Sequence, residues 1–144
     1  VLISISISKN IIDIIINTLI IALSTNFMNL LDLRPGRAIK VYLLIIFGIF
    51  FNVIESIKNI IMLLVPNVLA YFNYDLKAKS MMGDTGSNVL GISIGIIFVI
   101  SFPLNVRVFW LLFLVFIHIL TEKYSLTKII EGNKFLNYID KLGR

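Results

Sequence analysis

Residues 82–104 read MGDTGSNVLGISIGIIFVISFPL. The first six letters place one carboxylate, Asp84, between two glycines, and the letters after them form an almost uninterrupted apolar run. A helix that crosses the hydrocarbon core of a bilayer needs roughly 20 predominantly apolar residues. The stretch therefore predicts a polar loop that turns into a membrane helix at about residue 87.

The composition of the whole chain points to the same surroundings. Of its 144 residues, 58% are hydrophobic and only 15% are charged, and none is a cysteine. Soluble domains are about 45–50% apolar and about 25% charged. Such a chain would expose large apolar patches in water, so we interpret it as a membrane protein. The lack of cysteine excludes disulfide bonds and thiolate metal ligands.

Five apolar segments predict an all-α, polytopic transmembrane bundle of about five spans. The segments cover about residues 11–31, 38–54, 59–74, 87–104 and 108–121. The third and fifth are short, so flanking polar residues must help them cross, or the bilayer must thin. Residues 122–144 are mixed in charge and amphipathic, which predicts a cytoplasmic surface helix that is broken near Gly132.

The first eight residues carry a different pattern. Isoleucine and serine alternate from Ile3 to Ser8, and a period of two is typical of a strand. We therefore expect a short strand outside the bilayer at the N-terminus. The alternative is that these residues extend the first helix.

The basic residues give an orientation for the five segments. They gather in the loop after the first segment, the loop after the third segment, and the tail; on the other side stand only Lys9, Lys58 and Arg107. Basic connections stay in the cytoplasm, so Asp32 and Asp84 should both lie at the cytoplasmic face. The net charge of +5 fits this bias and an attraction to anionic lipid. Nucleic-acid binding is disfavoured, because the charge is spread over three connections.

The segment around Asp84 suits a phosphate ligand. Gly83 and Gly86 let the backbone approach a phosphate closely, and the N–H groups at the start of the next helix favour an anion. Asp84 would repel that anion unless a cation lay between them, which predicts an Asp84–Mg²⁺–diphosphate arrangement. An Asp-Gly turn with an ordinary Ser or Thr helix cap explains the same residues.

A second polar segment should face the same side. Asn29 and Asp32 lie three residues apart, so they share a face if the first helix continues this far. They predict a polar pocket for a nucleotide or a metal, with Arg34 or Arg37 as charge-assisted donors to phosphate. The alternative, a helix end with basic residues that only orient the chain, is favoured for Arg37. Function is favoured for Asn29 and Asp32, because polar residues beside a membrane span are costly.

The chain has one histidine, His118, at the inner end of the last apolar segment. Histidine can contact phosphate or carry a proton near neutral pH. A lone histidine near a helix end is more often structural, and that alternative is favoured here.

The run Asn29-Leu30-Leu31-Asp32, followed later by Met82-Gly83-Asp84-Thr85-Gly86-Ser87, resembles the polyprenyl-phosphate N-acetylhexosamine-1-phosphate transferase family. The family pattern is Asn-x-x-Asn-Leu-x-Asp-Gly and then Met-Gly-Asp-x-Gly-Ser. The second motif is specific in this context, and the first is a divergent version. Both stand in the family's order.

The resemblance implies a multi-pass enzyme of the cell membrane with a cytoplasmic active site. It would transfer a sugar 1-phosphate from a UDP-sugar to a polyprenyl phosphate, with Mg²⁺, for the synthesis of cell-envelope polymers. By position, Asp84 corresponds to the metal-binding aspartate, and Asp32 is the second catalytic acid. Asn29 and Asp32 correspond to residues on the nucleotide side. The short N-terminal strand also matches the external strand of the family.

The chain departs from the family in several places. Family members have more spans and an earlier Asp-Asp pair, so residues 1–144 resemble the C-terminal half of such an enzyme. Leu33 and Pro35 replace a glycine and an aspartate of the family pattern, in the segment that the family uses for its uracil contacts.

We therefore expect the chain to be inactive alone. The alternative is a non-catalytic membrane module or pseudoenzyme. A separate N-terminal half or a second copy of the chain would be its partner.

Overall fold

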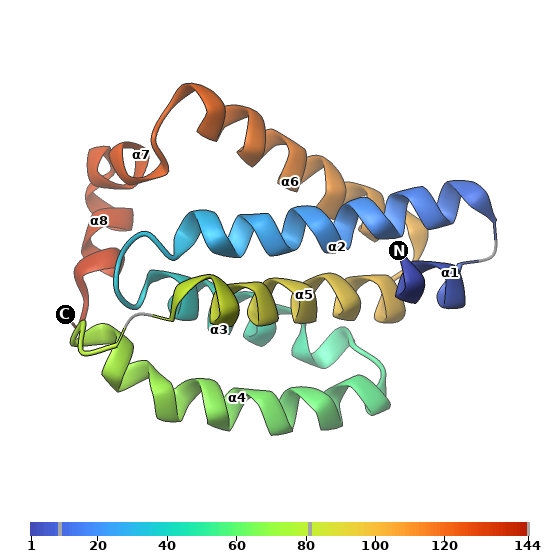
Figure 1. Ribbon diagram of the computed structural model, residues 1–144, viewed down its shortest axis with the longest axis horizontal. Helices are drawn as coiled ribbons and strands as arrows, with labels where there is room; N and C mark the ends of the chain where they lie inside the picture. The colour runs from blue at the N-terminus through green and yellow to red at the C-terminus, as the bar shows by residue number, and fades with distance from the viewer. Residues whose placement is uncertain (9, 81, 144) are drawn as a thin grey trace.

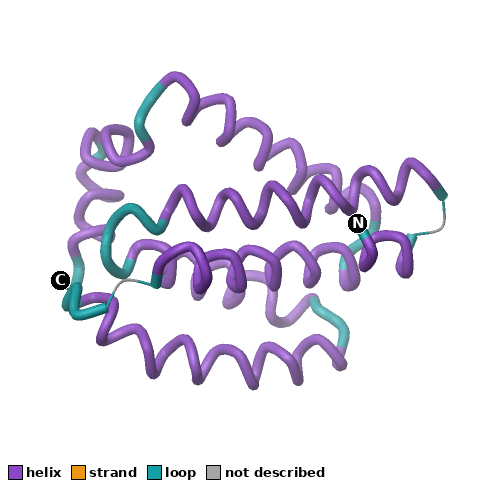
Figure 2. The backbone as a smooth tube through the Cα atoms, viewed as in Figure 1, coloured by secondary structure: helices purple, strands orange, loops and turns teal. Residues whose placement is uncertain are grey.

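A computed structural model describes residues 1–8, 10–80 and 82–143, and these residues contain helices and loops but no strand (Figure 1, Figure 2). The elements in chain order are α1 (Leu2–Ile7), α2 (Ile11–Leu31), α3 (Arg37–Ile49), the 3₁₀-helix η1 (Phe50–Asn52), α4 (Glu55–Leu76), α5 (Gly83–Ser101), α6 (Leu104–Lys123), α7 (Leu126–Gly132) and α8 (Lys134–Lys141). The prediction of an all-α polytopic bundle is confirmed.

The predicted N-terminal strand is wrong, because residues Leu2–Ile7 form the helix α1. The described part of the chain offers no strand with which it could pair. A lone strand beside a membrane would leave its N–H and C=O groups without partners, whereas a helix pairs several of them internally, as the Ile5 N–H pairs with the Val1 carbonyl oxygen. The alternative, an extension of the next helix, is not observed either. The side chain of Asn10 accepts a hydrogen bond from the Asp13 N–H and starts α2 as a separate helix.

Within the described residues, four helices are long and apolar enough to cross a membrane: α2, α4, α5 and α6. The chain is a multi-pass membrane protein. The segment expected at residues 38–54 is instead the 13-residue helix α3 followed by η1. At 1.5 Å per residue, α3 alone rises only about 20 Å, less than the roughly 30 Å of hydrocarbon. Together with η1 and the loop after it, α3 carries the chain from the end of the bundle where α2 ends to the other end, where α4 begins (Figure 1).

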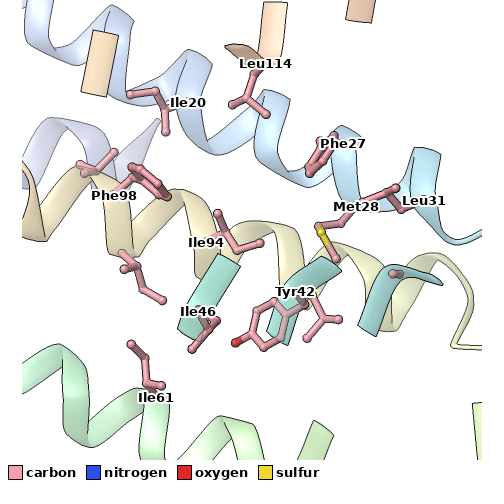
Figure 3. Packing of buried hydrophobic residues seen from close by; sticks show 14 of the residues in the cluster. Ile20, Phe27, Met28, Leu31, Tyr42, Ile46, Ile61, Ile94, Phe98 and Leu114 are labelled. Carbon is pink, nitrogen blue, oxygen red and sulfur yellow. The ribbon is translucent and has the colours of Figure 1, made fainter. Parts of the chain in front are cut away.

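The helices α2 and α5 form the centre of the bundle. Figure 3 shows their buried side chains, among them Ile20, Met28 and Ile94, facing one another. The two backbones approach closely because α5 has glycines at the crossing. A Cβ atom added at Gly91 would lie 2.4 Å from the Thr25 Cα atom, and one at Gly95 would lie 2.7 Å from the Ile21 Cα atom.

The two ends of the bundle carry different polar groups. One end of the bundle holds the loop at residues 32–36, residues 77–80 after α4, the start of α5, and the tail helices α7 and α8 (Figure 1). We call it the motif end. At the opposite end, Asp13 pairs with Arg107 at 3.3 Å, and the Arg107 Nη1 atom donates to the Asn17 Oδ1 atom at 2.6 Å. This pair joins α2 to α6 and compensates the two charges, as expected for charges near a membrane span.

Candidate active site at the motif end

The first motif meets the second through the amide of Asn29. Its Oδ1 atom accepts a hydrogen bond from the Ser87 hydroxyl, and its Nδ2 atom donates to the Asn88 Oδ1 atom at 2.8 Å. Ser87 is fully buried, and its hydroxyl also contacts the Gly83 carbonyl at 3.0 Å. The close crossing of α2 and α5 therefore brings two segments that are distant in the sequence into one hydrogen-bonded unit. Sequence reasoning did not single out Asn88.

The two glycines of the second motif have different local roles. Gly83 has a φ of +64°, a left-handed conformation that favours glycine, at the point where the loop becomes α5. Gly86 lies in the first turn, where an added Cβ would come 2.0 Å from the Met82 Cγ atom. Because Gly86 has no Cβ atom, the Met82 side chain can pack against the first turn of α5. Asp84 stands between them on the exposed surface.

Asp32 ends α2 and is half-buried beside the second motif. Burial raises the pKa of its carboxyl above the ordinary value of 3.8, and the negative charges of Asp75 and Asp84 raise it further. The backbone N–H of Gly83 acts in the opposite direction. The Asp32 Oδ1 atom is buried without a hydrogen-bond partner among the described residues. Asp32 thus lies within electrostatic reach of Asp84.

A third acid, which sequence reasoning missed, is Asp75 in the last turn of α4. It is fully buried, and its two carboxylate oxygens accept hydrogen bonds from the Gly36 N–H at 2.8 Å and the Met82 N–H at 3.2 Å. The sequence gives one indication of Asp75: it is an acid at the end of a membrane span. The loop that follows this span should lie on the same side of the membrane as Asp32 and Asp84.

The donor set fits a magnesium ion held partly by a substrate. Within the described residues, no three His, Cys, Asp or Glu side chains converge closely enough to hold a metal by themselves. Mg²⁺ keeps several waters and is usually bound by one or two carboxylates together with phosphate oxygens. The exposed Asp84 and the unpartnered Asp32 Oδ1 atom match that requirement.

The basic residues of the loop after α2 contact the tail. Arg37 is only 3% exposed and forms a two-point ion pair with Asp140, at 2.7 Å and 3.0 Å. Arg34 pairs with Glu131 at 3.2 Å, and both side chains of that pair are about half exposed. In this geometry the buried Arg37 ties the tail to α3, whereas Arg34 forms a half-exposed pair with the tail.

His118 does not contact the other predicted site residues. Its Nδ1 atom lies 2.7 Å from the Leu114 carbonyl oxygen in its own helix. The Nε2 atom is buried and has no partner among the described residues. The structure therefore joins Asn29, Asp32, Gly83 and Asp84 at one place, and His118 lies apart from that group.

Comparison with known proteins places the chain in a family. The profile of glycosyl transferase family 4 matches residues 2–102, from α1 to the end of α5. The chain belongs to glycosyl transferase family 4. The match includes both motifs, and His118 and the tail lie beyond it.

A relative of the chain is the phospho-N-acetylmuramoyl-pentapeptide-transferase of Thermotoga neapolitana, which is 38% identical over 86 residues. The alignment covers 58% of this chain but only 28% of that protein. No solved structure gives a significant match.

Proposed function

We propose that the chain supplies the second half of an active site that transfers a sugar 1-phosphate from a UDP-sugar to a polyprenyl phosphate. The observation that carries the proposal is the meeting of the Asn29–Asp32 segment with the Gly83–Asp84 segment at one end of the bundle. The family and the name of the relative support the same type of reaction. Envelope polymers of the cell membrane are the expected destination of the lipid product.

Each site residue has a role in this proposal. Asp84, with Asp32, would hold Mg²⁺, and the bound metal would offset the charge on the diphosphate during phosphoryl transfer. The backbone N–H groups of the first turn of α5, which begins at Gly83 and contains Gly86, would face phosphate oxygens. Asn29 would contribute to the part of the site that binds the nucleotide. Its hydrogen bonds with Ser87 and Asn88 would fix its position there.

The basic residues and His118 have narrower roles. Arg34 is the cation of the loop that can reach a phosphate, since it is half exposed. Arg37 would act only by keeping the loop in place. His118 stays a candidate for a contact with substrate, which would require its Nε2 atom, buried in this structure, to become accessible.

The chain would need a further segment to complete the site. Its alignment spans about a quarter of the curated relative, and among the described residues no three His, Cys, Asp or Glu side chains converge to hold a metal by themselves. We therefore propose that residues 1–144 form the C-terminal half and are inactive alone. A non-catalytic module that binds a separate N-terminal half would have the same structure. Only a measurement of transferase activity can distinguish this module from half of an enzyme.

The test measures Mg²⁺-dependent release of UMP from a UDP-N-acetylhexosamine in membranes that contain undecaprenyl phosphate. The chain alone should release none. Joined to the N-terminal half, whether in one reading frame or as a separate subunit, it should be active.

In the complete protein, Asp84→Asn should lower turnover about 100-fold or more, because metal stabilisation of the transition state is worth several kcal/mol. Glu55→Gln, an exposed site at the other end, is the control. UMP release by the chain alone would refute the half-site idea, and unchanged turnover in Asp84→Asn would remove Asp84 from metal binding.

A further inference from the structure

Asp75 links the loops that carry the two motifs. Its Oδ2 atom accepts from the Gly36 N–H, shortly after Asp32, and its Oδ1 atom accepts from the Met82 N–H, shortly before Asp84. We propose that Asp75 is a positioning residue that holds the two loops together and thereby sets the separation of Asp32 and Asp84. That separation matters for catalysis only if the proposed function is right, but the positioning itself does not depend on it.

The chemistry of the link requires a carboxylate. A buried ionised carboxylate is costly unless it accepts hydrogen bonds, and Asp75 is fully buried. Two backbone N–H groups satisfy it, one on each oxygen. Asparagine offers one acceptor oxygen and an NH₂ group, which would face a second donor. The isosteric Asp75→Asn change therefore breaks one of the two links.

The packing around Gly36 shows that the loop is seated on the end of α4. Gly36 has a φ of +73°, and an added Cβ would lie 2.4 Å from the Leu76 Cδ2 atom. Because Gly36 has no side chain, its backbone can pack against Leu76, and its N–H reaches the carboxylate of Asp75, the residue before Leu76. The loop before α5 approaches the same carboxylate from the other side through Met82.

The experiment measures the distance between the two loops directly. The chain has no cysteine, so nitroxide labels can be placed at Leu33→Cys and Thr85→Cys, both exposed positions next to Asp32 and Asp84. Pulsed electron paramagnetic resonance on the complete chain in lipid nanodiscs then gives the distribution of label distances. Asp75→Ala should broaden the distribution at least twofold and lengthen its mean, and Asp75→Asn should have a smaller effect.

A second pair of variants tests the Met82 link without altering Asp75. Met82 has a φ of −60°, which proline adopts, so Met82→Pro removes the N–H donor at a helix start. Met82→Ala removes the side chain but keeps the N–H, and is the matched control. Met82→Pro should broaden the distribution and Met82→Ala should not. The double variant Asp75→Ala/Met82→Pro should be no broader than Asp75→Ala alone, because both changes break the same bond.

Asp13→Asn, which removes a mostly buried carboxylate paired with Arg107 at the opposite end, controls for a general loss of packing and should leave the distance unchanged. A native distribution in both Asp75→Ala and Met82→Pro, with helix content retained by circular dichroism, would overturn the proposal. Additive broadening in the double variant would also overturn it, since independent damage adds. If the chain shows the expected distances but the completed protein transfers no sugar phosphate, the positioning role stands and the proposed function fails.

Discussion

Asp32 carries a negative charge in a place that disfavours it. The carboxyl is partly buried, its Oδ1 atom has no partner among the described residues, and Asp75 and Asp84 lie within electrostatic reach. These causes raise its pKa, and the Gly83 N–H offsets them only in part. Such a group gains most from a cation that binds between the acids, which is the electrostatic condition for a Mg²⁺ site.

The raised pKa of Asp32 predicts a dependence of stability on pH. Ionisation is less favourable in the folded chain than in the unfolded chain, where the pKa is near 3.8. The contribution of Asp32 to stability therefore falls as the pH rises from that value through the higher folded pKa. Asp32→Asn removes the penalty, so it should raise the thermal unfolding midpoint at neutral pH.

The gain from Asp32→Asn should disappear below pH 3.8, where Asp32 is protonated in both states. Circular dichroism melts in detergent at the two pH values measure both quantities. Added Mg²⁺ should stabilise the native chain at neutral pH more than the variant. A variant that melts earlier than the native chain at neutral pH would contradict this account of Asp32.

At the scale of elements, the crossing of α2 and α5 places the site. Ser87, Gly91 and Gly95 follow one another at every fourth residue of α5, and small residues at this spacing let two helices approach. The crossing brings Asn29 of α2 beside Ser87 of α5. Any change that separates the helices should therefore disturb the site as well as the fold.

Gly91→Ala tests the crossing. The new Cβ would meet the Thr25 Cα atom at 2.4 Å and the Ser24 carbonyl oxygen at 2.6 Å, and these backbone atoms move only with the helix. Overpacking of this kind costs about 1–3 kcal/mol, more than the roughly 1 kcal/mol that alanine gains over glycine in a helix. The unfolding free energy should fall.

The matched control for Gly91→Ala is Gly48→Ala in α3, where an added Cβ has nothing within 4 Å. It should be neutral, or stabilise by up to about 1 kcal/mol. Equal effects of the two variants on denaturant unfolding would contradict the tight crossing.

The tail is joined to the bundle by a buried ion pair. Arg37 and Asp140 are 3% and 7% exposed, and the Lys40 Nζ atom also donates to the carbonyl oxygens of Ile139 and Asp140, at 3.0 Å and 2.8 Å. Asp140→Asn leaves a buried guanidinium without its carboxylate, which costs about 3–5 kcal/mol. The cost should appear as release of the tail, seen as faster proteolysis after α6.

Glu131→Gln is the control for Asp140→Asn, because its pair with Arg34 is half exposed. Exposed pairs are worth about 0–1 kcal/mol, so this variant should digest at the native rate. If both variants release the tail alike, the buried pair does not hold it.

For the whole molecule, properties that depend on local sequence could be predicted, and those that depend on distant partners could not. The long apolar runs predict the membrane helices, and each motif marks its own loop. The number of apolar segments between the two loops, together with their basic residues, predicted that Asp32 and Asp84 lie on the same side of the membrane. The partners of Arg37 and of Asp75 lie in other segments of the chain, and no local pattern indicates them. The strand prediction failed for a related reason: a period of two says nothing of whether a pairing strand exists.

The placement of both motifs on one side of the membrane is the last property that can be tested. Leu33 lies in the loop after α2 and Thr85 in the first turn of α5, both elements of the motif end, whereas Ser56 lies in the first turn of α4, which begins at the opposite end (Figure 1). All three residues are exposed. Basic residues gather at the motif end, so that end should face the cytoplasm. Because the chain has no cysteine, each position can carry the only thiol in a single-cysteine variant.

A membrane-impermeant maleimide added to inside-out vesicles should label Leu33→Cys and Thr85→Cys and should spare Ser56→Cys. Right-side-out vesicles should give the reverse pattern. Labelling of Leu33→Cys and Ser56→Cys from one side would contradict the crossing by α3 and η1 that separates them. Labelling of Leu33→Cys and Thr85→Cys from opposite sides would remove the shared site itself, because Asp32 and Asp84 could then never face the same diphosphate.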